Sequence, residues 1–136
     1  MTNYLSPYLH FDGTAREAMT FYQSVLGGDL QLMTFGEMGM EGEHATRIMH
    51  GALTVRDGVV VMGADEPPGE TLVHGNDCTL ALAGDDADEL RTWFAGLSEG
   101  GEVHVPLSKQ MWGDEFGQAA DKYGVTWMVN IAGESA

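Results

Sequence analysis

The stretch Ala15-Arg-Glu-Ala-Met-Thr-Phe-Tyr-Gln-Ser-Val-Leu-Gly-Gly28 decides how the rest of the chain is interpreted. Its apolar residues recur at the i, i+3, i+4, i+7, i+8 spacing of one helix face, and a Gly-Gly pair ends the pattern. These apolar positions are Ala18, Phe21, Tyr22, Val25 and Leu26. The stretch therefore predicts an amphipathic helix followed by a sharp stop.

A second copy of this pattern occurs at Asp88-Glu-Leu-Arg-Thr-Trp-Phe-Ala-Gly-Leu-Ser-Glu-Gly-Gly101. Its apolar face consists of Leu90, Trp93, Phe94 and Leu97. Phe21 and Phe94 each lie six residues before the first Gly of their Gly-Gly pair. Self-similarity of this kind indicates a repeated structural unit, so we expect two related modules.

The segments after each helix also match. Asp29-Leu-Gln-Leu-Met33 and Glu102-Val-His-Val-Pro106 both begin with an acid and then alternate, as a half-buried strand does. Later, the β-rich runs 59–62 and 125–128 each follow a turn that ends in Gly, and each reaches a Met four residues beyond that Gly. Asp57-Gly58 predicts a hairpin between the runs 51–56 and 59–62.

Each half therefore reads as strand, helix and three strands, which predicts an α+β fold of two βαβββ modules. We expect one domain over 1–136, with a first module over 4–65, a Pro/Gly linker over 66–74 and a second module over 75–132. Neither half can cover both faces of its own sheet. The two sheets are therefore expected to meet and leave an open, barrel-like cup.

Composition narrows the possible functions of the 136-residue chain. The apolar fraction of 43% suffices for a core, and no segment is long and apolar enough for a membrane span. Six Lys and Arg against 21 Asp and Glu give a net charge of −15, which disfavours nucleic-acid and membrane-surface partners. The N-terminus shows no secretion signal, and the single Cys fits a reducing compartment. We expect a cytoplasmic bacterial protein.

Several short motifs, in their order along the chain, resemble one known family. They are Pro7-Tyr-Leu-His-Phe11, Ala18-Met-Thr-Phe-Tyr22, Leu26-Gly-Gly28, Ile48-Met-His50, Gly100-Gly101, Trp112-Gly-Asp-Glu-Phe-Gly117 and Asp121-Lys-Tyr-Gly-Val-Thr-Trp-Met128. Together they resemble the PhnB-like branch of the glyoxalase/bleomycin-resistance/extradiol dioxygenase, or vicinal oxygen chelate, superfamily. The resemblance extends over nearly the whole chain.

This resemblance implies where a metal would be bound. Metal-dependent members place His, Glu or related ligands on the first and last strands of each module, where a divalent ion acts as Lewis acid. Counting along this chain puts those positions at Pro7, Met62, Met128 and near Cys78. Proline offers no side-chain donor, and thioethers are poor ligands for Ni, Zn, Fe or Mn. We therefore expect no metal and no other cofactor.

The residues expected to line a ligand pocket combine three of these four strand positions with nearby candidates. They are Leu9, His50, Met62, Cys78, Trp112 and Met128, with Asp114 as a possible polar anchor. Several of them also have a plain alternative: His50 as a hydrogen-bonded structural residue, Cys78 and the Met residues as packing residues, and Asp114 as part of a solvated loop. His50 shares strand parity with Ile48, Ala52 and Thr54, so we expect it on their face.

Three functions follow, in decreasing order of preference. The first is a metal-independent protein that binds a small, largely apolar molecule in the cup, with catalysis left open. The second is a metal-dependent lyase or dioxygenase that uses unusual ligands such as His50 and Asp114. The third is a ligand-free module with a structural or partner-binding role. A homodimer is the assembly that the resemblance implies. The methyltransferase label of this branch is disfavoured, because no glycine-rich cofactor loop follows a first strand.

Overall fold

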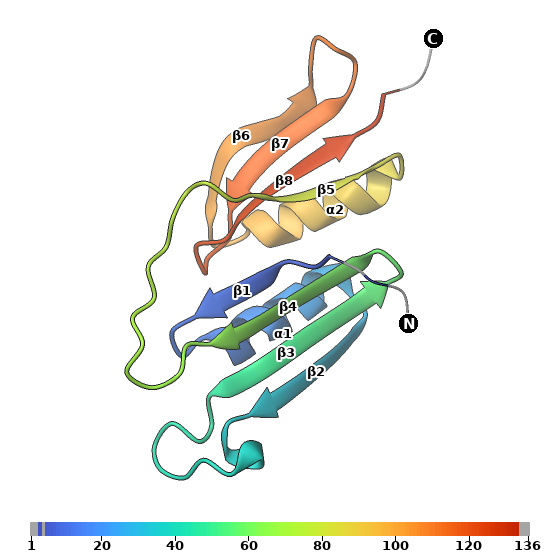
Figure 1. Ribbon diagram of the computed structural model, residues 1–136. Coiled ribbons are helices and arrows are strands. Elements are labelled where there is room, and N and C mark those ends of the chain that lie inside the picture. The colour runs from blue at the N-terminus through green and yellow to red at the C-terminus, as the bar shows by residue number, and fades with distance from the viewer. Residues whose placement is uncertain (1–2, 4, 134–136) are drawn as a thin grey trace. The chain divides into compact units, whose positions relative to one another are not determined.

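The computed structural model describes residue 3 and residues 5–133 and divides into two compact units between Val73 and His74. Tyr4, where the first module was expected to begin, lies outside the described residues. Each unit consists of one mixed four-stranded sheet and one long helix (Figure 1).

The first unit has the order strand, helix and three strands. Its elements are β1 (Tyr8–Phe11), α1 (Ala15–Leu26), β2 (Asp29–Thr34), the 3₁₀ turn η1 (Gly36–Met38), β3 (Ile48–Arg56) and β4 (Val59–Asp65). The strands lie in the order β1-β4-β3-β2, with β1 parallel to β4 and the other pairs antiparallel. The turn between β3 and β4 contains Gly58 with a φ of 82°, as the Asp57-Gly58 signal predicts.

The second unit repeats this order. It contains β5 (Leu80–Gly84), α2 (Ala87–Ser98), β6 (Glu102–Lys109), β7 (Glu115–Ala120) and β8 (Thr126–Ile131). The strands lie in the order β5-β8-β7-β6, and β5 is parallel to β8. The predicted α+β fold of two βαβββ modules is thereby confirmed. Residues 66–79, which connect β4 to β5, form no helix or strand.

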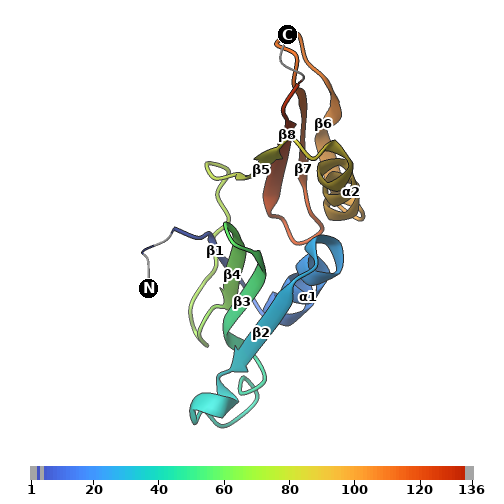
Figure 2. The same cartoon turned by 90° about the vertical axis from the view of Figure 1, so that its right-hand side faces the viewer.

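Each helix covers one face of its own sheet, as Figure 2 shows for α1 and α2. Glycines in the sheets allow this close packing. A Cβ built on Gly63 would lie 3.1 Å from the Phe11 ring, and one on Gly117 would lie 2.8 Å from the Phe94 ring. The core on the helix side of the first sheet includes Phe11, Met19, Tyr22, Leu53 and Val61. The apolar face predicted for each helix is therefore its packing face.

The Gly-Gly pair after α1 is required by the backbone. Gly28 has a φ of 94°, and a Cβ on it would lie 2.5 Å from the carbonyl oxygen of Thr54. Only glycine allows both the left-handed conformation and this close approach of two backbones. After α2 the two requirements fall on successive glycines: Gly100 has a φ of 78°, and a Cβ on Gly101 would lie 2.1 Å from the Ala120 carbonyl oxygen.

Each unit also contains one buried carboxylate. Asp65, at the end of β4, accepts hydrogen bonds from the backbone N–H groups of Gly13 (2.8 Å), Ala15 (2.9 Å) and Ile48 (2.9 Å). Asp121 accepts from the N–H groups of Tyr123 and Val125 and from the Trp127 indole at 2.9 Å. Buried charge of this kind persists only where hydrogen bonds replace lost hydration.

Candidate functional site

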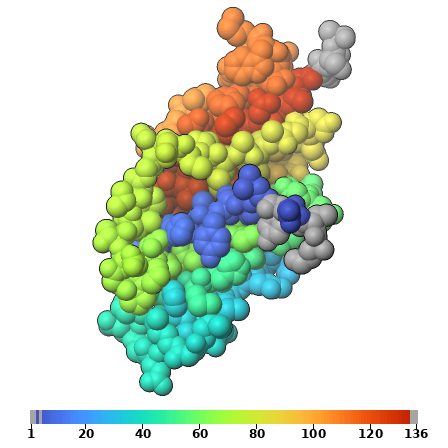
Figure 3. Space-filling view, in the orientation of Figure 1, coloured from blue at the N-terminus to red at the C-terminus, as the bar shows by residue number. Residues whose placement is uncertain are grey.

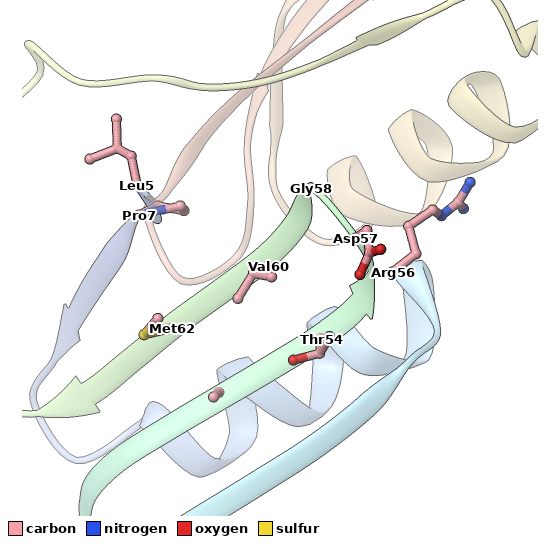
Figure 4. Close-up of a pocket in the computed structure, with 9 residues that line it drawn as sticks. Leu5, Pro7, Thr54, Arg56, Asp57, Gly58, Val60 and Met62 are labelled. Atoms are coloured by element: carbon pink, nitrogen blue, oxygen red, sulfur yellow. The ribbon is translucent and has the colours of Figure 1, made fainter. Parts of the chain in front are cut away.

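The sheet face that α1 does not cover contains a cavity of about 640 Å³ (Figure 4). Figure 3 views the first module from this side. The lining residues come from the strand ends, the β3–β4 hairpin and the alternate positions of β3 and β4. They are Leu5, Pro7, Ala52, Thr54, Arg56, Asp57, Gly58, Val60 and Met62. The cavity wall is apolar along β4 and becomes polar at the hairpin, where Arg56 and Asp57 lie.

The neighbour of Met62 on the open face is Tyr8. The parallel register pairs Tyr8 with Met62, and the Met62 N–H donates to the Pro7 carbonyl at 3.2 Å. Side chains at registered positions of adjacent strands point to the same face. Tyr8, one residue after the position reached by counting, therefore occupies the β1 position beside Met62.

Tyr8 and His50 form a pair on this face. The Tyr8 hydroxyl lies 3.0 Å from His50 Nδ1, and the two rings are stacked with centroids 5.7 Å apart. The Tyr8 ring also lies 5.5 Å from the His10 ring, and His10 Nδ1 is 2.8 Å from a carboxylate oxygen of Glu66. Partial burial raises the pKa of Tyr8, so its phenol stays protonated at neutral pH.

The expected parity between His50 and Ile48 does not hold. Met33 of β2 pairs with His50, but Thr34 pairs with Ile48, so Met49 is an extra residue in β3. This β-bulge breaks the alternation, because two residues of one strand then oppose a single residue of the other. Ile48 is fully buried, whereas His50 is half-buried and contacts Tyr8. His50 keeps the predicted parity with Ala52 and Thr54, both of which line the cavity.

Two of the predicted pocket residues lie elsewhere. Leu9 pairs with Gly63, whose position faces Phe11 and Met19, so Leu9 points to the helix side and not to the face of Met62. Cys78 is exposed and precedes β5. Since Ala81 is the β5 residue that pairs with Met128, Cys78 lies three residues before the position beside that methionine.

The second module brings Met128, Trp112 and Asp114 toward its own open face. Met128 alternates with the buried Trp127 and Val129 and pairs with Ala81 and Gln118. The Trp112 side chain is in the β6–β7 turn, 62% exposed, and its ring centroid lies 6.5 Å from that of Phe116.

Asp114 is held by hydrogen bonds within the second module. It accepts from the side-chain amide of Asn130 at 3.0 Å and from the Gly133 N–H at 2.8 Å. These two bonds, that of Asn130 first, lower the pKa of the carboxyl. The arrangement favours an ionised carboxylate that fixes the strand end, rather than a general base.

A second cavity of about 460 Å³ lies in the same module. Its lining includes Arg91, Lys109 and Glu115. The Arg91 guanidinium binds the Glu115 carboxylate through two nitrogen atoms, and this contact is the main reason that the pKa of Glu115 is lowered. Because these charges satisfy each other, the cavity offers a ligand fewer polar groups than its composition suggests.

The strand positions at which the resemblance implies metal ligands offer poor donors for a divalent ion. Met62 of β4 lies in register with Tyr8 of β1, which carries a phenol, and Met128 of β8 lies in register with Ala81 of β5. Neutral phenols and thioethers bind Zn, Ni, Fe and Mn poorly. Among the residues that the structure describes, no three His, Cys, Asp or Glu side chains come close enough together to hold a metal ion.

Comparison with known proteins identifies the family. The profile of the Glyoxalase/Bleomycin resistance protein/Dioxygenase superfamily matches residues 5–129. The chain belongs to the glyoxalase superfamily. It is 30% identical to protein YjdN of Escherichia coli (strain K12), over 93% of this chain and 94% of YjdN.

Two solved structures agree with this glyoxalase-superfamily assignment. Protein PA1353 from Pseudomonas aeruginosa matches with a TM-score of 0.88 and 33% identity, over 98% of this chain and 100% of that one. A PhnB protein from Bacillus cereus matches with a TM-score of 0.76 and 26% identity, over 96% of this chain and 100% of that one. The predicted resemblance to the PhnB-like branch is thereby confirmed.

Sequence reasoning missed Tyr8 in this glyoxalase-superfamily chain. The count back from Phe21 gave Pro7, because it assumed an unbroken correspondence between helix and strand positions. Alternation along Tyr8-Leu9-His10-Phe11 could have identified Tyr8 and His10 as one face and Leu9 and Phe11 as the other.

None of the described helices could span a membrane.

Proposed function

We propose that this protein binds a small, largely apolar molecule against the open face of the first module, without a metal ion. The observation that supports this most directly is the cavity of about 640 Å³ with Met62 and Val60 in its wall. Ligand sites in proteins are usually concave and mainly apolar, with a few polar groups that fix orientation. The cavity volume is within the range of known small-molecule sites.

The residues of the wall favour an adaptable site over a rigid one. Met62 of the first module has a counterpart at the same strand position of the second module, Met128. Methionine is unbranched and polarisable, so it adapts to apolar ligands of different shape. The formal charge of −15 disfavours anionic ligands, since the whole chain repels them.

The metal-independent part of the proposal rests on donor chemistry. Where metal-dependent relatives need imidazole or carboxylate groups, this chain offers Tyr8, Met62 and Met128. A bound ion would stabilise the native state and raise the melting temperature. We expect no such rise with Ni, Zn, Mn, Fe or Co. A stoichiometric ion that survives chelator treatment would instead support the metal-dependent lyase or dioxygenase.

Binding can be measured with a neutral fluorescent probe, N-phenyl-1-naphthylamine, whose emission rises in apolar surroundings. We expect saturable binding, and at least about a tenfold weaker affinity for Met62→Lys, because a charge placed in an apolar wall must be desolvated. Met111→Lys is the matched control, since Met111 is 99% exposed. Equal binding by the two variants would contradict a site at Met62.

We further propose that the protein is a homodimer. Several apolar side chains of the second module are exposed in the single chain, including Val103 (47%), Val105 (36%), Met111 and Trp112. Exposed apolar surface of this extent is usual where another protein surface packs. A second copy is the simplest partner, and light scattering at micromolar concentration should give twice the chain mass. The cup expected between two modules stays a prediction.

A further inference from the structure

The open face of the first module carries a hydrogen-bonded polar pair, Tyr8 and His50. The two residues come from β1 and β3, which are separated in the sheet by β4. Strands two apart are about 10 Å distant, so only a long side chain such as tyrosine reaches across. The intervening strand presents the small Ala64 on this face, beside His10 in the register. The contact is therefore built by three strands and does not depend on a loop.

The pair lies at the edge of the cavity. Tyr8 is registered with Met62, and His50 is two residues from Ala52 on the same strand face. Both Met62 and Ala52 line the cavity. An apolar ligand that packs against Met62 therefore has the Tyr8 hydroxyl and the His50 imidazole within reach of one of its ends.

The hydrogen-bonding capacity of the pair is not exhausted by its internal bond. If the Tyr8 hydroxyl donates to Nδ1, then His50 Nε2–H remains a donor and the Tyr8 oxygen remains an acceptor. If Nδ1–H donates to the Tyr8 oxygen, the Tyr8 hydroxyl becomes the donor and Nε2 the acceptor. Within residues 3 and 5–133, the structure shows no other hydrogen bond to either side chain. In both tautomers the pair thus presents one donor and one acceptor.

We propose that Tyr8 and His50 together bind a hydroxyl group, phenolic or enolic, of an otherwise apolar ligand. This inference rests on the proposed function and specifies the class of ligand. A hydroxyl group both donates and accepts, so it satisfies both groups of the pair, whereas a carbonyl or ether oxygen satisfies only the donor. An unsatisfied polar group facing a bound apolar ligand weakens binding.

The charges around the pair favour a neutral hydroxyl over a carboxylate. The raised pKa of Tyr8 keeps its phenol neutral. The Glu66 carboxylate lies 2.8 Å from His10, whose ring is beside that of Tyr8, and the chain as a whole is strongly acidic. A ligand carboxylate would be repelled by both, while a neutral phenol or enol would not.

The test uses 1-naphthol and 1-methoxynaphthalene, which share an aromatic frame and differ in the hydroxyl proton. Each competes with N-phenyl-1-naphthylamine, so both affinities come from one assay. We expect the wild-type protein to bind 1-naphthol about tenfold more tightly than the ether, the effect of one to two hydrogen bonds. Tyr8→Phe and His50→Ala should each reduce that ratio to about two or less.

If the pair had only a structural role, its loss would weaken the binding of 1-naphthol and 1-methoxynaphthalene equally. The ratio of the two affinities would then stay unchanged. The Tyr8→Phe/His50→Ala double variant should lower this affinity ratio no further than either single variant does, because the two side chains act as one unit. His104→Ala, on the exposed strand β6, is the matched control and should keep the wild-type ratio.

The possible failures are distinguishable. If N-phenyl-1-naphthylamine does not bind to the wild-type protein, the proposed function fails, and this inference fails with it. If that probe binds but the ratio of the two naphthalenes is close to one, or is unchanged in Tyr8→Phe, the inference is overturned while the proposed function stands. Tyr8→Phe keeps the ring and its stacking on His50, so loss of folding does not confuse the result.

Discussion

The two modules share one backbone plan but present different side chains at corresponding positions. In the first, Met62 lies between Tyr8 and Ala52; in the second, Met128 lies between Ala81 and Gln118. Two residues before Ala52 is His50, and two residues before Gln118 is Phe116. Among the described residues, the polar pair therefore occurs in the first module alone. The repeat preserves packing on the helix side, while the open faces have diverged.

The buried acids of the two modules also differ in the parts of the chain that they connect. Asp65 joins the end of β4 to the start of α1 and to β3, so it connects elements distant in sequence. Asp121 instead organises its own turn and reaches the Trp127 indole six residues away. Ile131 of β8 corresponds to Asp65 of β4, because each lies three residues after the methionine on the open face of its strand. Each module thus has a buried carboxylate, placed by different means.

The largest expected effect comes from removing these acids. Asp65→Ala and Asp121→Ala should each lower the free energy of unfolding by about 3–5 kcal/mol, because each leaves several buried N–H groups without their acceptor. Urea denaturation measures the change. Asp29→Ala, at an exposed strand end, should stay within about 0.5 kcal/mol of the wild-type protein. A loss below about 1 kcal/mol for one acid alone would show that the modules do not depend on them equally.

A smaller effect separates the two helix starts. The Asp86 side chain accepts a hydrogen bond from the Glu89 N–H at 3.2 Å, whereas Thr14 makes no side-chain cap at α1. Asp86→Ala should therefore cost about 1 kcal/mol, and Thr14→Ala less than about 0.5 kcal/mol. Thermal unfolding of the two variants provides the measurement. If Thr14→Ala were the more costly, the side-chain cap at Asp86 would not be what separates the two helix starts.

The smallest effect is the acid sensitivity of the second module. Hydrogen bonds from Arg91 and Asn130 hold the pKa values of Glu115 and Asp114 below their ordinary values of 4.5 and 3.8. A lowered native-state pKa contributes stability above the ordinary value, and this contribution is lost as the pH falls through the native-state pKa. Unfolding free energies measured from pH 5 down to about pH 2 should therefore decline. Glu115→Gln should show a shallower decline, and an unchanged slope would contradict the assignment.

Much of the fold was predictable because its signals are local. Helical spacing gave both helices, Gly-Gly pairs gave their ends, and Asp57-Gly58 gave the hairpin of the first module. The family assignment followed from the order of short motifs and is confirmed. Within the candidate site, Met128 alternates with the buried Trp127 and Val129, so it lies on the face opposite the core of the second module. The extra residue at Met49 could not be seen, since a bulge depends on how the partner strand pairs.

The sequence by itself determined the repeated βαβββ order, the face of each helix that packs and the methionines at the strand positions where the resemblance implies metal ligands. Periodicity and turn chemistry act over a few residues, so they can be read directly. The tertiary structure alone decided that Tyr8 meets His50, 42 residues away, and that Asp65 satisfies the N–H of Ala15, 50 residues away. Such contacts arise only when strand pairing brings distant segments together. No pattern within either segment encodes that register.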